Sequence, residues 1–496
     1  MKRHNAVLLL ILILTLAFRL YFVFQAPNFD YEAYFNIRQI DNIMKEGLPI
    51  FNDSLSYGGR TTIFIPLFHY ILAFFSFILT ISISLKFIPN IFASSIVLIV
   101  YLITNKIIKN KNISLITAFV SAFIPIFIIE TINSVSIYSL TVPLMFLAIY
   151  FLINLENKKL VKYMIILIVL FPFIHSSVLI LTVSLITYLI LIRLAHLKST
   201  KAELELILFS IFLTIWIEFI IYKNALLAHG PSVIWQNIPA IISIFYFNTT
   251  NFFEAILKIG LIPLVGGVYV IYRYLFRETN KPIYLLISFA FASTLLLWLK
   301  LINPGVTLTI LGIVLTILFA KSYKSASHYI KKTRFSNYKK AAFIFFIVAF
   351  ILSSVFPCFY FTDERIQSAV SEEEMQAFLW LRENTNSKST ILGSLYQGHL
   401  ITAIANRKNV IDSNFLLIHL PGNRVDDVET IYTTKYKTIA VDLLNKYDVD
   451  YIIFSRRTAE EIDIDQISYI NDEKCFELVY NEGVQIYKSL CRIEKL

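Results

Sequence analysis

Acidic and basic side chains first gather in the stretch from Asn28 to Arg60, which holds five carboxylates and three basic residues. The stretch follows an apolar run, and Asp30 lies only a few residues beyond the end of that run. Its carboxylate is therefore expected at a membrane surface, at the mouth of any cavity that later helices enclose. We interpret Asp30 as the best catalytic candidate; a polar interfacial collar of Asp30, Tyr31 and Tyr34 is the alternative.

Two glycine pairs carry different expectations. Gly58 and Gly59 precede Arg60, so backbone can approach a ligand closely while a guanidinium is presented to it. This turn is either a phosphate contact or a plain tight turn. Gly266 and Gly267 lie inside an apolar segment and predict close helix packing. The sequence has no HExxH, Walker or GxSxG motif, so it indicates none of those enzyme classes.

The composition indicates a membrane protein with many spans. Of 496 residues, 57% are hydrophobic and only 16% are charged, with a mean hydropathy of +0.68. That is more apolar surface than a soluble core can bury. The net charge of +10 comes from Lys and Arg clustered between apolar runs, as topology determinants are, so no nucleic acid is expected as a partner.

The N-terminal apolar run extends over about 20 residues, enough to cross about 30 Å of hydrocarbon. No small-residue cleavage site follows it, so we predict a retained span with a cytoplasmic N-terminus. Arg19 lies inside this run, near its outer end. It either snorkels to the interface or provides a counter-charge for an anionic lipid headgroup.

Ten further apolar segments complete a map of eleven spans. With this map the cytoplasmic stretches hold 21 Lys and Arg against 6 in the external loops, as the positive-inside rule requires. The balance holds only if Thr62–Ile83 re-enters or lies along the surface; a twelfth full span is the alternative. The later spans are predicted near residues 88–104, 113–129, 139–154, 163–175, 176–192, 204–222, 256–272, 283–298, 302–320 and 341–356.

The segments 163–175 and 176–192 divide one apolar run of about 30 residues, because a single crossing would leave its two basic flanks on opposite sides. Each half would reach only about 20 Å, which implies local thinning or a cavity. His175 marks the predicted outer turn. It is either a structural histidine at a helix end or a contact for substrate or phosphate.

From residue 357 the composition changes, and a soluble α/β domain is predicted over 357–496, outside the membrane because the number of spans is odd. EEEMQAFLWLREN and KTIAVDLLNKYD indicate helices, and STILG, NVID and DYIIFS indicate strands. CFELVYNEGVQIYK predicts a hairpin closed at Asn481–Gly483. The three cysteines fit neither a disulfide framework nor a zinc site, and Cys475 with Cys491 either pair on export or stay thiols.

The layout also resembles a known superfamily. A first span, a long outer loop with an early acid and the string LSYGGRTTIFIPLFHY are similar to the GT-C membrane glycosyltransferases, which use polyprenyl-phosphate-linked sugars. The chain most resembles archaeal relatives of the oligosaccharyltransferase catalytic subunit. The strings FLWLRENT, ILGSLYQGHLITAIANRKNVIDSNF and LLNKYDVDYIIF resemble the order of elements in that subunit's outer domain. The resemblance implies a transmembrane domain of 1–356 with a catalytic external loop of 27–87, and an extracytoplasmic domain of 357–496.

Two departures separate this chain from oligosaccharyltransferases. Ser394–Gly398, the position of the acceptor-recognising WWDYG motif in that family, reads SLYQG here. The long outer loop with a catalytic glutamate is reduced to about KLINPGV, and a further acidic motif is reduced to Glu130. We therefore expect a related transferase with another acceptor, protein or glycan, and keep transfer to protein asparagine as the alternative.

The resemblance implies that an acceptor hydroxyl or amide attacks the anomeric carbon with inversion while the lipid phosphate leaves. Asp30 would take or polarise the acceptor proton, and Glu130 is the second catalytic candidate. A divalent ion, Mg²⁺ or Mn²⁺, held by Asp30 and Glu130 would be one source of positive charge for the phosphate. The other sources are Arg60, Arg38, Arg19 and Lys300. Further candidate substrate contacts are Glu32, Tyr57, His69 and His175.

The leading hypothesis is thus a multi-pass cell-membrane glycosyltransferase acting on a lipid-linked sugar at the extracytoplasmic face, in contact with membrane lipids. A transporter or flippase of lipid-linked glycans is a second class, although the inverted repeats that transporters usually show are not found. A non-catalytic assembly factor, with the outer domain as a binding module, is a third.

Overall fold

The computed structural model describes residues 2–248, 251–333 and 338–492. The chain divides into two compact units, each assembled from separate segments. The first unit comprises Met1–Gln25, Ile65–Ile221 and Tyr246–Gln367, and the second comprises Ala26–Phe64, Tyr222–Phe245 and Ser368–Leu496. The predicted domain boundary at residue 357 lies within a helix, and the C-terminal segment of the second unit begins after that helix ends.

The first unit is helical. Two of its helices, α11 and α12, continue into segments of the second unit. The helices are α1 (Lys2–Gln25), α3 (Leu67–Ile78), α4 (Ile81–Ser94), α5 (Ile96–Ile108), α6 (Lys111–Ser121), α7 (Pro125–Ile129), α8 (Tyr138–Ile153), α9 (Lys158–Leu170), α10 (Val178–Leu194), α11 (Lys201–His229), α12 (Ala240–Asn248), α13 (Phe252–Ile259), α14 (Leu261–Phe276), α15 (Lys281–Trp298), α16 (Pro304–Lys332), α17 (Lys339–Phe350) and α18 (Phe356–Gln367).

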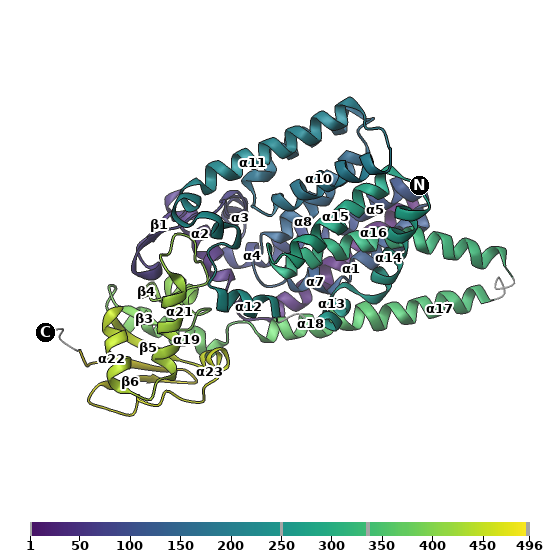
Figure 1. Ribbon diagram of the computed structural model, residues 1–496. Helices are drawn as coiled ribbons and strands as arrows, with labels where there is room; N and C mark the ends of the chain where they lie inside the picture. Colours follow the sequence, from purple (N-terminus) through teal and green to yellow (C-terminus); the bar gives the residue numbers. More distant parts are fainter. Residues whose placement is uncertain (1, 249–250, 334–337, 493–496) are drawn as a thin grey trace. The chain divides into compact units, whose positions relative to one another are not determined.

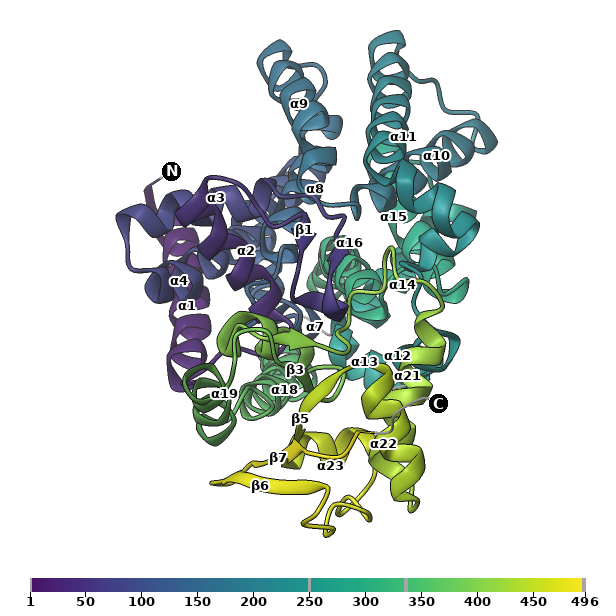
Figure 2. The same cartoon turned by 90° about the vertical axis from the view of Figure 1, so that its left-hand side faces the viewer.

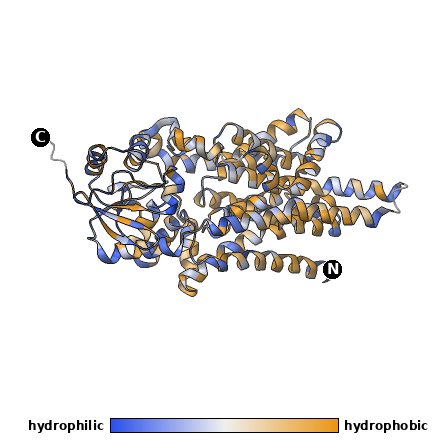
Figure 3. Ribbon diagram, turned by 90° about the horizontal axis from the view of Figure 1, so that it is seen from below, coloured by the Kyte–Doolittle hydropathy of each residue, from blue (hydrophilic) through white to orange (hydrophobic). Residues whose placement is uncertain are grey.

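This chain is a polytopic helical membrane protein. Within the described ranges, six helical segments are long and apolar enough to cross a membrane, or seven if the bent pair α13 and α14 is one span. Figure 3 shows the long helices of the first unit coloured predominantly as hydrophobic. The map of eleven spans, which also counts the shorter helices, stays a prediction.

Helix α16 is the most buried of the membrane-crossing candidates and packs against α14 and α15, beside which it runs in Figure 1. Gly266 and Gly267 of α14 make the close approach possible. A Cβ on Gly267 would lie 2.7 Å from a side-chain carbon of Leu315, and a Cβ on Gly266 would lie 2.6 Å from the ring of Phe319. The close helix packing predicted from this glycine pair is therefore confirmed.

One local prediction in the first unit is confirmed, and a second stays a prediction. The apolar run of residues 163–192 is broken, because α9 ends at Leu170, a short 3-10 turn follows at Phe171–Phe173, and α10 begins at Val178. The segment Thr62–Ile83 contains α3, whose 12 residues rise only about 18 Å. Its re-entrant or interfacial position stays a prediction. The basic stretch after residue 320 is helical as far as Lys332, because α16 continues through it.

The second unit contains a five-stranded mixed sheet in the order β4-β3-β5-β7-β6, part of which faces the viewer in Figure 2. Strands β4, β3 and β5 run parallel, and β7 and β6 add an antiparallel hairpin. The strands are β1 (Asn52–Asp53), β2 (Arg60–Thr61), β3 (Thr390–Leu392), β4 (Lys408–Asn409), β5 (Val449–Phe454), β6 (Phe476–Asn481) and β7 (Gln485–Ser489). The helices are α2 (Ala33–Glu46), α19 (Glu372–Asn384), α20 (Gly398–Leu400), α21 (Pro421–Thr433), α22 (Lys437–Lys446) and α23 (Arg456–Ile462).

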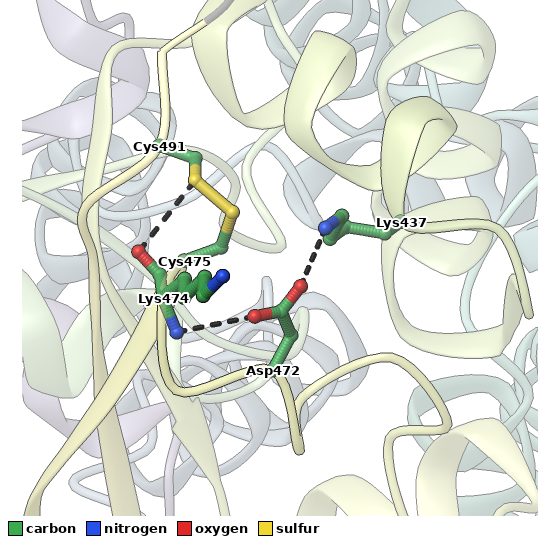
Figure 4. The surroundings of a disulfide bond; sticks show 5 residues. All are labelled: Lys437, Asp472, Lys474, Cys475 and Cys491. Carbon is green, nitrogen blue, oxygen red and sulfur yellow. Dashed lines mark hydrogen bonds and ion pairs between the residues drawn. A yellow bond between two sulfur atoms is a disulfide. The ribbon is translucent and has the colours of Figure 1, made fainter.

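Most predicted elements of the C-terminal segment are present, with β3 inside STILG and β5 over most of DYIIFS, but β4 covers only Asn409 of the predicted strand NVID. The amphipathic helix is α19, and the first ten residues of KTIAVDLLNKYD form α22. The predicted hairpin is formed by β6 and β7, with Asn481 opposite Gln485. Cys475 before β6 and Cys491 after β7 form a disulfide, one of the two outcomes left open (Figure 4). The hairpin is thus closed covalently at its open end.

Candidate functional site

Asp30 sits in a tight turn that leads into α2 in the second unit. Its side chain is 3% exposed, and its Oδ1 accepts a hydrogen bond from the backbone N–H of Ala33 at 2.9 Å. Asp side chains favour such local bonds to the backbone in turns that start helices. The carboxylate is therefore oriented by the peptide chain itself.

The same turn is tied to the C-terminal segment of the second unit. The Tyr31 hydroxyl donates to Glu374 Oε2, and the backbone N–H of Val370 donates to the Phe29 carbonyl at 3.2 Å. Burial, followed by the Glu374 charge, raises the pKa of Tyr31 well above its ordinary value. Tyr31 and Tyr34 are 7% and 4% exposed, so they pack inside the protein and do not form the exposed aromatic collar considered as the alternative.

Arg38 and Asp53 fix the loop that follows α2. The guanidinium donates from Nη1 to Asp53 Oδ2 at 2.6 Å and from Nη2 to Oδ1 at 2.9 Å. Burial alone would raise the pKa of Asp53, but Arg38 and the backbone N–H groups of Leu55 and Ser56 outweigh it and hold that pKa below its usual value. This two-point ion pair locks the ends of the loop together.

Arg60 forms a second, more deeply buried ion pair. Its Nη2 donates to Asp412 Oδ1 at 3.0 Å and its Nη1 donates to the Asn414 carbonyl. The side chains of Arg60 and Asp412 are 5% and 1% exposed. Burial tends to raise the pKa of Asp412, but the Arg60 charge leads the interactions that bring it below its ordinary value.

The residues around this pair complete a joint between residues 56–61 and 409–414. The Tyr57 ring stacks 4.8 Å from the Arg60 guanidinium, and its hydroxyl donates to the Asp412 carbonyl at 2.5 Å. Ser56 Oγ donates to Asp412 Oδ2 at 2.6 Å. Gly58 and Gly59 have φ angles of 78° and 132°, which favour glycine. The glycine pair thus forms the tight turn that was one of its two expected roles.

These contacts define what Arg38, Arg60 and Tyr57 do in this unit. Both guanidinium groups bind carboxylates of the chain itself, and the Tyr57 hydroxyl is engaged with backbone. Their predicted roles toward a donor phosphate and a substrate stay predictions, whereas their contribution to holding the loop is direct.

The segment Ser394–Gly398 lies over a buried polar network. Gln397 Nε2 donates to Glu374 Oε1 and to Ser455 Oγ, both at 2.8 Å. Gln397 Oε1 accepts from the backbone N–H of Ser394 at 3.1 Å. Glu374 therefore receives hydrogen bonds from both Tyr31 and Gln397, and it connects this segment to the turn that carries Asp30.

Glu130, the second predicted acid, lies in the first unit at the end of α7. Its carboxylate is pressed against Gly305 in the first turn of α16: a Cβ on Gly305 would come within 1.9 Å of Glu130 Oε1. The side chain of Asn303 accepts from the Gly305 N–H at 2.8 Å and begins the helix. The first turn of a helix carries partial positive charge, so α16 stabilises a carboxylate at this position.

The loop that follows Glu130 has an unusual backbone. Asn133 and Val135 have φ angles of 54° and 48°, in the left-handed region. A β-branched residue such as Val135 rarely adopts this conformation, and a cost of about 1–3 kcal/mol is typical of such strain. Val135 is 1% exposed, so the surrounding first unit enforces the conformation.

Arg19 is 1% exposed and lies between helices of the first unit. Its Nε donates to Asn90 Oδ1 of α4 at 2.9 Å, and its Nη2 donates to the Thr131 hydroxyl just after α7. Its guanidinium also lies 5.6 Å from the Phe127 ring centroid. This burial corrects the expectation that Arg19 snorkels to the interface, while its role toward a lipid phosphate stays a prediction.

The remaining predicted site residues are distributed over both units. His175 lies in the turn before α10, where its Nδ1 accepts from the Ser177 N–H at 3.0 Å and its ring packs 5.2 Å from that of Tyr138. This is the helix-end position that was one of its two expected roles. His69 is buried in α3, exposed Glu32 precedes α2, and exposed Lys300 lies 5.6 Å from the Phe247 ring in the short loop between α15 and α16.

A metal centre would need several clustered ligands. In the portion of the chain that the structure describes, no group of three or more His, Cys, Asp and Glu side chains is arranged to hold a metal ion. Asp30 and Glu130 belong to different units. Their role as ligands of Mg²⁺ or Mn²⁺ therefore stays a prediction, and no catalytic step is assigned to a metal here.

Sequence reasoning did not single out Asp53, Glu374, His399 or Asp412. His399 is 4% exposed, with Nε2 lying 3.0 Å from Ser413 Oγ and its ring 5.5 Å from that of Phe35. One available signal was the position of Asp412, which follows the apolar pair Val410 and Ile411 shortly after β4 ends at Asn409. The partners of these residues lie too far away in sequence to be read from spacing.

No protein-family model and no curated protein matches this sequence. Solved structures do share its fold. The oligosaccharyltransferase AglB from Archaeoglobus fulgidus, in complex with an inhibitory peptide and a dolichol-phosphate, superimposes with a TM-score of 0.70 at 16% identity, over 91% of this chain and 69% of that one.

Two other membrane transferases are similar. ArnT from Cupriavidus metallidurans, bound to undecaprenyl phosphate, has a TM-score of 0.58 at 9% identity over 97% of this chain and 98% of that one. The mycobacterial arabinofuranosyltransferase AftD has a TM-score of 0.58 at 11% identity over 97% of this chain and 40% of that one. The resemblance predicted from sequence is thus confirmed for the fold.

Proposed function

We propose that this protein, which has the fold of the GT-C glycosyltransferases, transfers a sugar from a polyprenyl-phosphate-linked donor to an acceptor at the extracytoplasmic face of the cell membrane. The observation that carries the proposal is a likeness over at least 91% of the chain to two solved structures that contain a polyprenyl-type phosphate. A likeness of this extent includes both units of the chain.

Asp30 is the proposed general base. It takes the proton of the acceptor as that acceptor attacks the anomeric carbon, and the lipid phosphate leaves from the opposite side of the sugar, which gives inversion. Two features support the assignment: the carboxylate is 3% exposed, and the N–H of Ala33 fixes its orientation. A base with a fixed orientation loses little entropy on reaching the reactive geometry.

Glu130 is proposed as the second acid of the site. Its carboxylate lies against the first turn of α16, whose partial positive charge suits an acid that would interact with an electron-poor or cationic group of the substrate. The phosphate contacts are proposed among the cations named from the sequence, with exposed Lys300 as the best placed to reach a ligand.

The disulfide between Cys475 and Cys491 supports an extracytoplasmic position for the C-terminal segment. Disulfides persist in oxidising compartments and are rare in the cytosol. With an odd number of spans, this orientation places the N-terminus in the cytoplasm, as the charge distribution predicts.

Transfer to protein asparagine is the second candidate function, favoured by the TM-score of 0.70 to an oligosaccharyltransferase. Against it stands the segment Ser394–Gly398, which has neither tryptophan nor aspartate, and whose Gln397 side chain is fully buried in the network with Glu374. A glycan acceptor is therefore the first proposal.

The test uses full-length protein in lipid vesicles that contain a radiolabelled polyprenyl-phosphate hexose, with either oligosaccharides or an asparagine-sequon peptide as acceptor. We expect label to move from the lipid fraction to an oligosaccharide, with release of polyprenyl phosphate. Label moving to the peptide would support the second candidate. Movement of intact donor between leaflets without transfer would contradict the proposal in favour of a flippase, and neither activity would favour an assembly factor.

A further inference from the structure

A cleft of about 510 Å³ opens on the second unit, between the hairpin of β6 and β7 and the segment of residues 465–471. Three apolar residues line it, Phe454, Ile467 and Ile470, which belong to or pack against the hydrophobic core of this unit. Neither Asp30 nor the cations named around it line this cleft, but Ser455, which hydrogen-bonds Gln397 and Glu374, does.

Four carboxamides line the cleft: Gln466, Asn471, Asn481 and Gln485. Each carboxamide offers two donor hydrogens and an acceptor oxygen. In the described part of the chain, no hydrogen bond to protein occupies the side chains of Gln466, Asn471 or Asn481, which are exposed. The cleft therefore presents a concentration of groups that can both donate and accept.

The carboxamide of Gln485 is already oriented. Tyr487, two residues along β7 and on the same face of the strand, donates from its hydroxyl to Gln485 Oε1 at 3.0 Å. This bond occupies the oxygen of the carboxamide and leaves its Nε2–H groups as donors. The ring of Tyr487 lines the cleft as well, so a flat apolar surface stands beside a fixed polar group.

The charges at the cleft are balanced. Asp465 and Arg456 are one acid and one base, and Arg456 is paired with Glu460 at 2.8 Å. An anionic or strongly cationic ligand would find no surplus of opposite charge among the lining residues. A neutral ligand with many hydroxyl groups fits this chemistry, because each hydroxyl also donates and accepts.

The hairpin wall of the cleft is held at both ends. At its open end lies the disulfide, and beside it Lys437 donates to Asp472 (Figure 4). At its tip Gly483, with a φ of 74°, packs so closely that a Cβ would lie 3.0 Å from the side chain of Glu373 on α19. A wall fixed before binding lowers the entropic cost of capturing a flexible ligand.

From these observations we infer that the cleft is a binding site for a neutral glycan. The four carboxamides hydrogen-bond sugar hydroxyls, and the Tyr487 ring packs against an apolar face of a sugar ring. Binding of the glycan does not depend on the transfer reaction, whereas its identification as the acceptor rests on the proposed function. An extended peptide is the competing occupant.

The experiment applies detergent-solubilised full-length protein, without donor lipid, to an array of neutral oligosaccharides, acidic oligosaccharides and peptides, and then measures the best ligand by calorimetric titration. We expect neutral oligosaccharides to bind. The double variant Gln466→Ala/Asn471→Ala changes two exposed loop residues and should raise Kd at least about tenfold, as the loss of one or two hydrogen bonds predicts. The matched control Gln376→Ala removes an exposed carboxamide from α19 and should leave Kd unchanged.

A second variant, Tyr487→Phe, keeps the ring and removes the hydroxyl that orients Gln485, so it should weaken binding less than the double variant. Absence of binding to every neutral oligosaccharide would overturn the inference, as would an unchanged Kd in a folded double variant. Peptide binding that the double variant abolishes would assign the cleft to the competing occupant. Because donor lipid is omitted, failure here leaves the transferase proposal standing, and failed transfer leaves the glycan site standing.

Discussion

The acids of this protein are held in two different ways. Asp53 and Asp412 each face a guanidinium, Arg38 and Arg60 respectively, in pairs that are largely or almost wholly buried. Asp30 accepts a backbone N–H within its own turn, and Glu130 lies against the first turn of α16. Asp30, in the second unit, is thus oriented by a backbone N–H, and Glu130, in the first unit, lies beside a helix end.

The two kinds of carboxylate suit different roles. A carboxylate that is bound by an arginine at two points gains stability but is poorly suited to accept a proton, because its pKa is driven down. A carboxylate that accepts a backbone N–H or lies beside a helix end is given a fixed direction by the main chain. We therefore expect changes at the paired acids to alter stability first and changes at the peptide-held acids to alter activity first.

The largest expected effect on stability follows from Asp412→Asn. It leaves Arg60 buried without a counter-charge, and breaking a buried ion pair in this way costs about 3–5 kcal/mol. Thermal unfolding of the full-length protein in detergent should show a clearly lower Tm for this variant than for the wild type.

Two matched variants grade this effect. Asp53→Asn leaves Arg38 without its counter-charge, but the Arg38 side chain is 16% exposed, so the loss of stability should be smaller. Asp41→Asn removes the exposed partner of Lys45 and should cost less than about 0.5 kcal/mol. Equal Tm values for Asp412→Asn and Asp41→Asn would show that the buried pair does not hold the loop.

Gly305→Ala should act on catalysis. The added Cβ would lie 1.9 Å from Glu130 Oε1, so the carboxylate must move, and a displacement of about 1 Å commonly lowers kcat about 100-fold. The measurement is sugar transfer in vesicles by the purified variant. Gly312→Ala on the same helix is the control, since its nearest neighbour is a methyl carbon of Ile124 at 3.2 Å.

The combination with Glu130→Asp sharpens this test. The shorter side chain vacates the space that the new Cβ occupies, so part of the lost activity should return. Full activity of Gly305→Ala alone would mean that the position of Glu130 does not matter for transfer.

A smaller effect concerns pH. Burial, with Arg60 and Arg38 adding to it against the pull of Asp412 and Asp53, lowers the pKa of His399 below its ordinary value. The unfolded chain then takes up a proton near pH 6.5 that the folded chain does not, so stability falls as pH decreases below that value, by at most about 1.4 kcal/mol per pH unit.

The lowered pKa values of Asp53 and Asp412 act in a separate window. Their stabilising contribution is present above the ordinary carboxylate pKa of about 3.9 and is lost only as pH falls below it. Unfolding midpoints measured between about pH 7.5 and 5 should therefore decrease in the wild type and decrease less in His399→Gln. If the unfolding midpoints of the two proteins depend on pH in the same way, His399 does not cause the loss of stability.

Elements with a strong local signal could be predicted from the sequence. Apolar length predicted the long helices, and periodicity predicted α19 and the hairpin of β6 and β7. Helix α2 was not predicted, although Ile40 and Ile43 form part of a buried face and Gly47 ends the helix with a φ of 78°. The polar residues between them hid this pattern in a stretch that was interpreted mainly for its charges.

The arrangement of the candidate site was less accessible. Arg60 and Asp412 are separated by 352 positions, and Tyr31 and Glu374 by 343, so no spacing rule connects them. The sequence did identify Asp30 and Glu130 as notable acids. It could not show that a backbone N–H and a helix end hold them, because those contacts exist only once the turn and the first turn of α16 have formed.

The central claim is that Asp30 is the base of a sugar transfer. Its most direct test compares Asp30→Asn with Asp41→Asn in the vesicle assay with radiolabelled polyprenyl-phosphate hexose. We expect transfer by Asp30→Asn to fall by about 10²–10⁴-fold at an unchanged Tm, and transfer by Asp41→Asn to match the wild type. Transfer by a folded Asp30→Asn protein at the wild-type rate would contradict the account.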